Sequence, residues 1–320
     1  MMRFVLVIPS GENSPLAITG VSTIFNLAKR HGLSLHFQIV SAQDSKTIDC
    51  GYLNLTADAH IDEDLNPDII ILPSVVGDPE ASLALNAHLV SWLDAMRKRR
   101  SKIASLCTGA YLLAKTGLLD GMEASSHCQA IPDLQKRFPR VNWLPEKIIT
   151  DTKGLYTSGG TLSSFNLIVY LLAKYFDRQT AHQIARFIQI DYPRSSQKPF
   201  FIVSNQKNHG DELILNIQNY LEEHAASFVN LDTLSWDFGL SRRSLNRRFK
   251  AATGDTPRTY IQRIKVEQVK QWLESENSSI SEVIQRIGYS DEKAFRALFK
   301  KMSGCTPSEY QKKFNQLYTA

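Results

Sequence analysis

One cysteine in the sequence has the surroundings of a reactive residue. Cys107 lies in the segment IASLCTGAYLL (residues 103–113), between a short apolar run and a run of helical character. A cysteine held at a sharp turn from a strand into a helix is a typical enzyme nucleophile. Three other roles are open, and we weigh them in this order: pocket lining, an inert buried side chain, and a redox sensor.

The residues next to Cys107 favour a binding role. Thr108 and the first N–H groups of the following helix would form a cradle for a carboxylate or another anion. The neighbouring pair His127-Cys128 could suggest a metal ligand set, but no further ligand follows at the spacing of a metal site. We therefore expect no metal and no cofactor.

The segments around Cys107 alternate between strands and helices. Expected strands are residues 4–8, 35–40, 68–73, 103–106 and 155–157, and expected helices are residues 18–30, 88–100, 108–114 and 162–176. The strands are apolar throughout, which is typical of a parallel sheet covered by helices on both faces. Sites in such sheets lie at the carboxyl ends of strands, and Cys107 follows one of these ends.

The C-terminal part contains one pattern twice, in residues 231–250 and 280–300. Each copy has a helical apolar period, a glycine, one apolar residue, a serine and a second helical period. Gly239 and Gly288 suit the left-handed residue that ends a helix, and Ser241, and Ser290 or Asp291, can cap the next helix. This is the layout of two helix-turn-helix units.

The second helix of the first unit carries side chains that suit DNA. The face opposite its apolar residues holds Arg242, Arg243, Asn246 and Arg247, and Arg and Asn match guanine and adenine edges in the major groove. A solvated basic face is the simpler interpretation of one such helix, but two units in one chain favour DNA binding. Residues 256–275 between the units predict a helix of about 30 Å. That length is close to the roughly 34 Å between successive major grooves on one side of DNA.

Composition and charge agree with two domains. Residues 231–320 hold 16 Lys and Arg against 10 Asp and Glu, whereas the whole chain of 320 residues has a net charge of +5. The basic excess therefore lies in the part with the repeated units, as expected for a nucleic-acid-binding module. No stretch is long and apolar enough for a membrane span, the N-terminus lacks the features of a signal peptide, and four scattered cysteines form no disulfide pattern. We expect a cytoplasmic protein without membrane contact.

The first part of the chain resembles a known superfamily. The resemblance is carried by the segment SLCTGAYLLAKTGLLDG, the following His127 and the segment TSGGTLSSFNLIVYLL. The first part resembles the PfpI-like branch of the class I glutamine-amidotransferase-like superfamily over roughly residues 3–190. The resemblance implies an α/β flavodoxin-like sandwich with Cys107 at the elbow and His127 as its helper. The acidic residues common in that family are replaced here by Ala17, Thr23 and Asn166. Without such groups to support a thiolate, Cys107 and His127 are expected to be vestiges rather than catalytic residues.

The second part closely resembles the AraC/XylS DNA-binding domain over roughly residues 212–316. The resemblance is carried by the two units and by the segments ATGDTPRTY (252–260) and SGCTPSEY (303–310) that follow them. By position it implies an all-α double helix-turn-helix domain in which the first unit contacts bases through Arg243, Asn246 and Arg247. In the second unit the corresponding candidates are Glu292, Lys293 and Arg296, with Asp291 at the cap. Because Glu292 is acidic, we expect the first recognition helix to supply more of the affinity.

The two resemblances together correspond to the GlxA-like transcription regulators. They imply a sensor and dimerisation domain at residues 1–191, a linker at 192–211 in which Phe200 to Val203 can pack on a domain, and a DNA-binding domain at 212–320. The expected partners are an operator in double-stranded DNA, a second copy of the chain and a small effector, with amino acids or amine metabolites as candidates. RNA polymerase is a further expected partner, since the family contains more activators. The effector is expected to contact Cys107, Thr108, His127 and Gly160.

Two other classes of function stay open at this point. The first is a cysteine-dependent hydrolase, hydratase or amidase with a DNA-binding tail, which would require a reactive Cys107. The second is a structural or interaction protein that responds to no ligand, which would show no thermal shift with any metabolite. The missing acidic residues disfavour the enzyme, and the repeated basic units disfavour a purely structural role.

Overall fold

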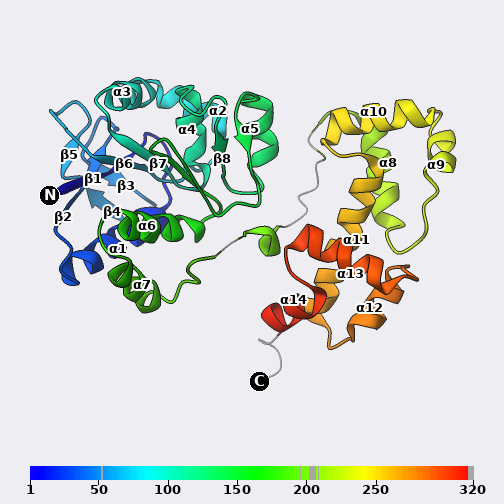
Figure 1. The fold of residues 1–320 in the computed structure, drawn as a ribbon. Helices are drawn as coiled ribbons and strands as arrows, with labels where there is room; N and C mark the ends of the chain where they lie inside the picture. Colours follow the sequence, from blue (N-terminus) through cyan, green and yellow to red (C-terminus); the bar gives the residue numbers. More distant parts are fainter. Residues whose placement is uncertain (52, 195, 202–206, 208, 316–320) are drawn as a thin grey trace. The chain divides into compact units, whose positions relative to one another are not determined.

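The chain folds into two compact units, Met1–Gln197 and Lys198–Ala320 (Figure 1). The computed structural model describes residues 1–51, 53–194, 196–201, 207 and 209–315. Among these residues, no helix is long and apolar enough to cross a membrane. Each unit is described by itself below.

The first unit is built on a seven-stranded sheet of order β10-β11-β7-β6-β1-β2-β5. The strands are β1 (Met2–Ile8), β2 (Leu35–Ser41), β5 (Ala59–His60), β6 (Ile69–Leu72), β7 (Lys102–Ser105), β10 (Ile149–Thr152) and β11 (Leu155–Ser158). Neighbours are parallel except for the antiparallel pair of β10 and β11. Two small sheets pair β3 (Thr47–Asp49) with β4 (Asn54–Thr56) and β8 (Glu123–Ala124) with β9 (Asn142–Trp143).

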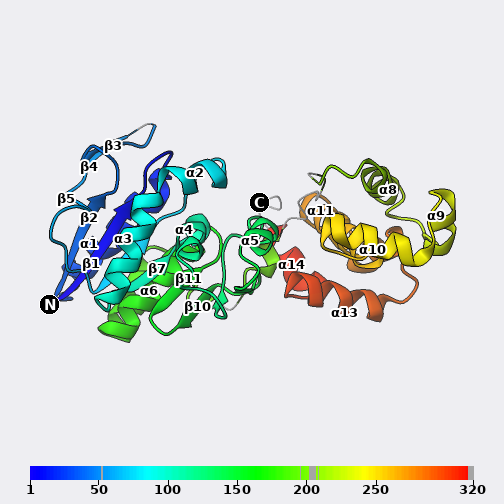
Figure 2. The same ribbon diagram turned by 90° about the horizontal axis from the view of Figure 1, so that it is seen from above.

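Helices cover both faces of this sheet. One layer is formed by α1 (Pro15–Arg30), α6 (Ser163–Tyr175) and α7 (Arg178–Phe187), and the other by α2 (Pro79–Leu85), α3 (Ala87–Lys98), α4 (Ala110–Lys115) and α5 (Ile131–Arg137). In Figure 2, which views the ribbon from above, α3 lies across the central strands. Along β1, Phe4, Leu6 and Ile8 enter one core while Val5 and Val7 enter the other. The predicted flavodoxin-like sandwich is confirmed.

The chain turns sharply after β7, and the helix there differs from the sequence expectation. We expected a helix over residues 108–114, but a 3-10 turn, η1 (Cys107–Gly109), precedes α4. The tight turn packs against the end of β6, where a Cβ on Gly109 would lie 2.5 Å from the carbonyl oxygen of Pro73. Only glycine, which has no Cβ, allows this approach.

The second unit is all helical, and its two helix-turn-helix units are confirmed. Its helices are η2 (Lys198–Phe200), α8 (Glu212–Glu223), α9 (Leu231–Asp237), α10 (Arg242–Thr253), α11 (Pro257–Ser275), α12 (Ile280–Arg286), α13 (Glu292–Ser303) and α14 (Pro307–Phe314). The pairs α9–α10 and α12–α13 form the two units, and α11 leads from one to the other (Figure 1). Ser241 and Asp291 cap α10 and α13, and Gly239 and Gly288 have φ of +65° and +81°.

Each helix-turn-helix unit has its own small apolar core. Leu245 and Phe249 of α10 pack with Ile217 and Tyr260 in the first. In the second, Phe295 and Phe299 of α13 pack with residues of α11, α12 and α14. The face of each recognition helix opposite these residues is left to solvent.

The segment expected as a linker, residues 192–211, is divided between the two units. Gln197 belongs to the first unit, where its side chain is buried, and Lys198 begins the second. Phe200 packs on Phe314 of the second unit, with ring centroids 5.7 Å apart. Ile202 and Val203, for which a packing role was also expected, lie outside the described residues.

Candidate functional site: an elbow pocket and a nucleic-acid interface

Cys107 occupies a strained turn at the carboxyl end of β7. Its φ of +52° lies in the left-handed region, which costs a non-glycine residue about 1 to 3 kcal/mol. Two hydrogen bonds hold the turn: the Cys107 N–H donates to Ser158 Oγ at 3.3 Å, and Ser126 Oγ donates to the Cys107 carbonyl at 2.7 Å. The backbone geometry is that of a nucleophile elbow, as the sequence indicated.

The electrostatics of this elbow favour uncharged groups. Cys107 is only 5% exposed, and burial raises the pKa of its thiol, an effect that hydrogen bonds to Thr108 and Thr161 oppose without overcoming. Burial also lowers the pKa of His127, so its imidazole is neutral near pH 7. Both shifts favour the uncharged forms, whereas nucleophilic attack by a cysteine requires the thiolate.

The positions that carry acidic groups in enzymes of this superfamily are occupied by side chains with local structural contacts. Ala17 is buried in the core on one face of the sheet. Thr23 Oγ1 donates to the carbonyl of Thr19, and Asn166 Nδ2 donates to the carbonyl of Leu162 at 3.4 Å. These residues stabilise α1 and α6 and supply no base for Cys107.

A cavity of about 240 Å³ opens beside the elbow. Its lining consists of Val75, Gly77, Pro79, Thr108, Tyr111, His127, Gln129 and Ala130. Two of the four expected effector-binding residues, Thr108 and His127, are therefore in the wall. The other two, Cys107 and Gly160, are not among the lining residues, and effector contact by all four stays a prediction. Cys107 is 5% exposed, and Gly160 packs against His127, where a Cβ would lie 3.0 Å from Cδ2 of the ring.

Tyr111 is a pocket residue that we did not predict. Its hydroxyl donates to Asp133 Oδ2 at 2.9 Å, and the same oxygen accepts a hydrogen bond from Arg137 Nε at 2.7 Å. Burial and the bond to Asp133 raise the pKa of Tyr111, so its phenol stays protonated. The available signal was its spacing, because a residue four positions after Cys107 returns to the same side of the helix.

The first recognition helix presents two arginines to solvent. Arg243 and Arg247, one turn apart on α10, are exposed and make no hydrogen bond or ion pair with another described residue. Asn246 is half-buried between them, and Arg242 lies 3.7 Å from Asp232 of α9. These four residues form the α10 basic face.

A neighbouring arginine on α10 has a structural role instead. Arg248 forms two hydrogen bonds with the carboxylate of Asp211, at 2.7 and 2.9 Å, which tie α10 to the start of α8. The pKa of Asp211 is lowered, chiefly by the hydrogen bond from Arg248. The sequence alone did not separate Arg248 from the arginines that remain available to a partner.

The second recognition helix, α13, has fewer unpaired charged side chains for DNA contact. Glu292 Oε2 accepts hydrogen bonds from Ser281 Oγ at 3.1 Å and from Arg296 Nη2 at 3.3 Å. Two of the three candidates on α13 are thus paired with each other and joined to α12. Lys293 is exposed, and among the described residues it has no ion-pair partner.

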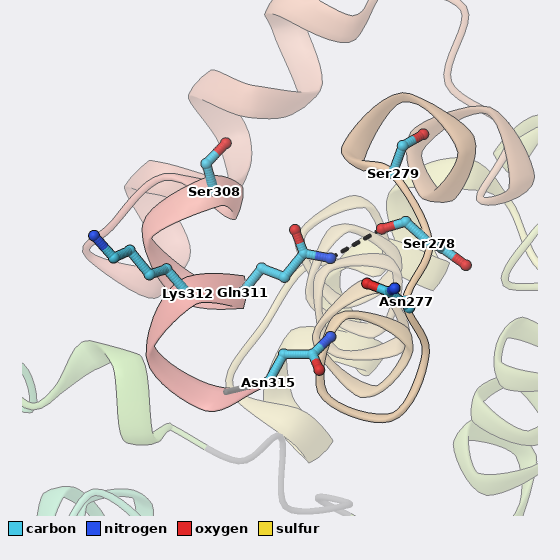
Figure 3. Close-up of a pocket in the computed structure, with 7 residues that line it drawn as sticks. All are labelled: Asn277, Ser278, Ser279, Ser308, Gln311, Lys312 and Asn315. Carbon is cyan, nitrogen blue, oxygen red and sulfur yellow. Dashed lines mark hydrogen bonds between the residues drawn. The ribbon is translucent and has the colours of Figure 1, made fainter. Parts of the chain in front are cut away.

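A polar groove of about 430 Å³ lies between the start of α12 and α14 (Figure 3). It is lined by Asn277, Ser278, Ser279, Ser308, Gln311, Lys312 and Asn315. Gln311 Nε2 donates to the carbonyl of Ser278 at 2.9 Å, and Asn315 Nδ2 donates to the carbonyls of Leu273 and Glu276, each at 2.9 Å. These amide groups hydrogen-bond to backbone carbonyls in and around the chain between α11 and α12, so the residues of the groove hold α14 against this part of the domain.

A covered α/β sandwich with a cysteine elbow, followed by two helix-turn-helix units, defines a two-domain protein of the sensor and DNA-reader kind. Residues 6–174 match the DJ-1/PfpI family, and residues 234–313 match a helix-turn-helix domain family. The chain belongs to the DJ-1/PfpI family and joins that domain to an AraC-type helix-turn-helix domain.

Two transcriptional regulators are similar to this chain over most of its length. The HTH-type transcriptional regulators GbdR and CdhR of Pseudomonas aeruginosa are 24% and 23% identical to this chain. The first alignment covers 96% of this chain and 81% of GbdR, and the second covers 87% of this chain and 82% of CdhR. A crystal structure of an AraC family transcriptional regulator from Pseudomonas putida has a TM-score of 0.52 at 16% identity, covering 59% of this chain and all of that chain, and it supports the fold.

Proposed function

We propose that this protein is a sequence-specific DNA-binding transcription regulator that responds to a small metabolite in its DJ-1/PfpI domain. The observation that carries the proposal is the α10 basic face, with Arg243 and Arg247 exposed on a capped recognition helix. A planar guanidinium can donate two hydrogen bonds to a guanine edge, and each such pair contributes about 1 to 3 kcal/mol of discrimination. Relatives aligned over most of this chain are named as HTH-type transcriptional regulators.

We further propose that the first unit is a sensor and not an enzyme. The neutral thiol of Cys107 and the neutral imidazole of His127 disfavour nucleophilic chemistry. The cavity beside them is smaller than the roughly 300 Å³ at which pockets for drug-sized ligands begin. An amino acid or a small amine metabolite is therefore the effector class to test first.

The remaining partners follow from this assignment. The protein acts in the cytoplasm as a homodimer, each copy contacting two adjacent major-groove segments of an operator. As an activator it would also contact RNA polymerase. The phosphate contacts of its Lys and Arg residues would make operator binding steeply dependent on salt.

Fluorescence anisotropy tests the DNA interface. The probe is the duplex that the full-length protein enriches from a random pool. Arg243→Ala and Arg247→Ala should each weaken specific binding about tenfold, the loss of one good base contact. Lys293→Ala should weaken it less, and Arg186→Ala, which removes an exposed arginine from the first unit, serves as the charge control. The interface is wrong if both α10 variants bind within twofold of wild type while Lys293→Ala abolishes binding.

A thermal-shift screen tests the sensor. The full-length protein is heated with a panel of amino acids and quaternary amines, and a ligand at 100 times its Kd should stabilise the folded state by about 2.7 kcal/mol. Ala130→Leu, which fills the cavity, should remove the shift, whereas Cys107→Ala should keep it because the cavity lining does not include Cys107. A shift that survives Ala130→Leu but vanishes in Cys107→Ala would place the effector elsewhere.

A further inference from the structure

One lysine in the second unit is buried at the junction of the two helix-turn-helix units. Lys265 lies near the middle of α11 and is 6% exposed. Its Nζ donates to the carbonyl of Ser227 at 3.2 Å and to the carbonyl of Ile287 at 2.9 Å. Ser227 belongs to the chain between α8 and α9 that leads into the first helix-turn-helix unit, whereas Ile287 ends α12 of the second helix-turn-helix unit. One ammonium group therefore contacts both.

The polar groups that contact this ammonium come from the two sides of the junction between the helix-turn-helix units. Both hydrogen-bond acceptors are backbone carbonyls, and the carbonyl of Ile287 lies at the negative end of the α12 dipole. The ring of Tyr289 lies 5.4 Å from Nζ and adds a cation–π contact. Burial lowers the pKa of Lys265, because removing a charge from water is unfavourable. An apolar side chain would avoid this cost, so the gain must come from joining the carbonyls.

A second contact joins the units at the same place. Gly288 has a φ of +81°, and a Cβ on it would lie 2.3 Å from the carbonyl oxygen of Ala226. The turn of the second helix-turn-helix unit therefore packs against the chain between α8 and α9, which leads into the first helix-turn-helix unit. Ala226 and Ser227 are consecutive, as are Ile287 and Gly288, so the two contacts form one junction.

We propose that Lys265 is a positioning residue that fixes the separation and rotation of the two recognition helices, and thereby sets the half-site spacing that the protein accepts. The inference rests on the proposed DNA-binding function. A single helix such as α11 can bend or twist, but a helix with a closed junction beside it cannot do so freely. The two recognition helices then move as one rigid body on DNA.

Rigid coupling has a measurable consequence for operator choice. Each inserted base pair turns the second half-site by about 35° and moves it by about 3.4 Å along the duplex. A rigid pair of recognition helices cannot follow both changes, so it loses the contacts of one unit. A loosely joined pair can adjust and keeps them.

The test uses the full-length protein and the duplex that it enriches from a random pool. A series of duplexes carries one, two or three extra base pairs between the two segments protected in the major groove. Wild type should lose about 20-fold in affinity at two extra base pairs, as expected when one good set of base contacts is lost. Lys265→Met should bind the original duplex more weakly and lose less than about threefold across the series.

A matched control lies on the same helix. Lys270 is also buried, but its Nζ donates to the carbonyl of Phe201 and pairs with Glu267, and these contacts lie away from the junction. Lys270→Met should lower stability and keep the steep spacing profile of wild type. Circular dichroism of each variant verifies that the second unit is folded.

Two further variants keep the test decisive if Lys265→Met does not fold. Gly288→Ala should push the two helix-turn-helix units apart while Lys265 is retained, and the dependence of affinity on half-site spacing should become weaker. Lys265→Arg keeps a buried cation and should retain the steep profile. If Gly288→Ala shows the wild-type profile, and so does Lys265→Met where it folds, the positioning role is refuted. If wild type enriches no duplex at all, the proposed DNA-binding function fails and this inference falls with it.

Discussion

Replacing Gln197 by alanine tests how the last residue of the first unit is held. Its side chain is 3% exposed, Nε2 donates to the carbonyls of Ser126 at 3.0 Å and Pro145 at 2.6 Å, and Oε1 accepts from the N–H of Gly160 at 2.9 Å. Gly159 allows this insertion, since a Cβ there would lie 2.4 Å from Oε1. Gln197→Ala leaves these three backbone groups without their partner, whereas the carbonyl of Lys147, which accepts a longer bond from Nε2 at 3.3 Å, keeps its bond from Ser125 Oγ.

The magnitude follows from the burial of those groups. An unsatisfied buried polar group costs about 1 to 3 kcal/mol. The bond to Ser126 is buried, whereas the bonds to Pro145 and Gly160 are partly buried, and water can replace Gln197 there in part. We therefore expect a loss of about 3 kcal/mol in the unfolding free energy of the first unit. For a unit of this size that is a fall of about 6 to 12 °C in Tm.

Differential scanning calorimetry of the full-length protein measures this change in the transition of the first unit. Gln197→Glu should destabilise more than alanine, because its carboxylate would face two carbonyl oxygens. Gln183→Ala, at an exposed position of α7, should change the unfolding free energy by less than about 0.5 kcal/mol. A loss below about 1 kcal/mol for Gln197→Ala would refute the reasoning, because solvent would then satisfy all three groups equally well.

Three further predictions concern single residues. Because burial raises the pKa of Cys107, iodoacetamide at pH 7.5 should alkylate it at least about tenfold more slowly than free cysteine, as measured by mass spectrometry, and rapid alkylation would revive the enzyme hypothesis. Phe299→Ala empties a fully buried site in the second helix-turn-helix core and should cost about 3 to 5 kcal/mol in a denaturant titration. The pKa of His127 is lowered in the folded state, so the unfolded chain binds a proton on this residue more tightly than the folded chain does. The neutral ring therefore contributes its full stabilisation above the unfolded pKa of about 6.5, and this contribution falls as the pH is lowered. His127→Gln should therefore lose less stability than wild type between pH 7 and pH 5, and an equal loss would contradict this assignment.

The architecture could be predicted because its signals are local. Apolar runs ended by proline or glycine mark the buried strands β1 and β6, as at Pro9 and Pro73. In the second unit, Ser241 and Asp291 begin helices and Gly239 ends one, each through its own backbone preference. Such preferences act within a few residues and are visible without tertiary structure.

The side-chain partners could not be predicted because they come from distant parts of the chain. Nothing in the sequence around Glu292 shows that its carboxylate bonds Ser281, and nothing near Arg248 shows that it pairs with Asp211. Which residues line the cavity beside Cys107 likewise depends on how the surrounding loops pack. Local pattern therefore found the recognition helices, and tertiary contacts decided which of their charged residues remain available to DNA.

The central claim is that one chain recognises specific DNA through two helix-turn-helix units, and genome-wide DNA footprinting of the full-length protein tests it most directly. We expect discrete sites, each with two protected major-groove segments about 10 to 11 base pairs apart, and the loss of these sites in the Arg243→Ala, Arg247→Ala double variant. Genes beside the sites would then indicate the effector. Uniform protection without discrete sites, or an unchanged pattern in the double variant, would contradict the account.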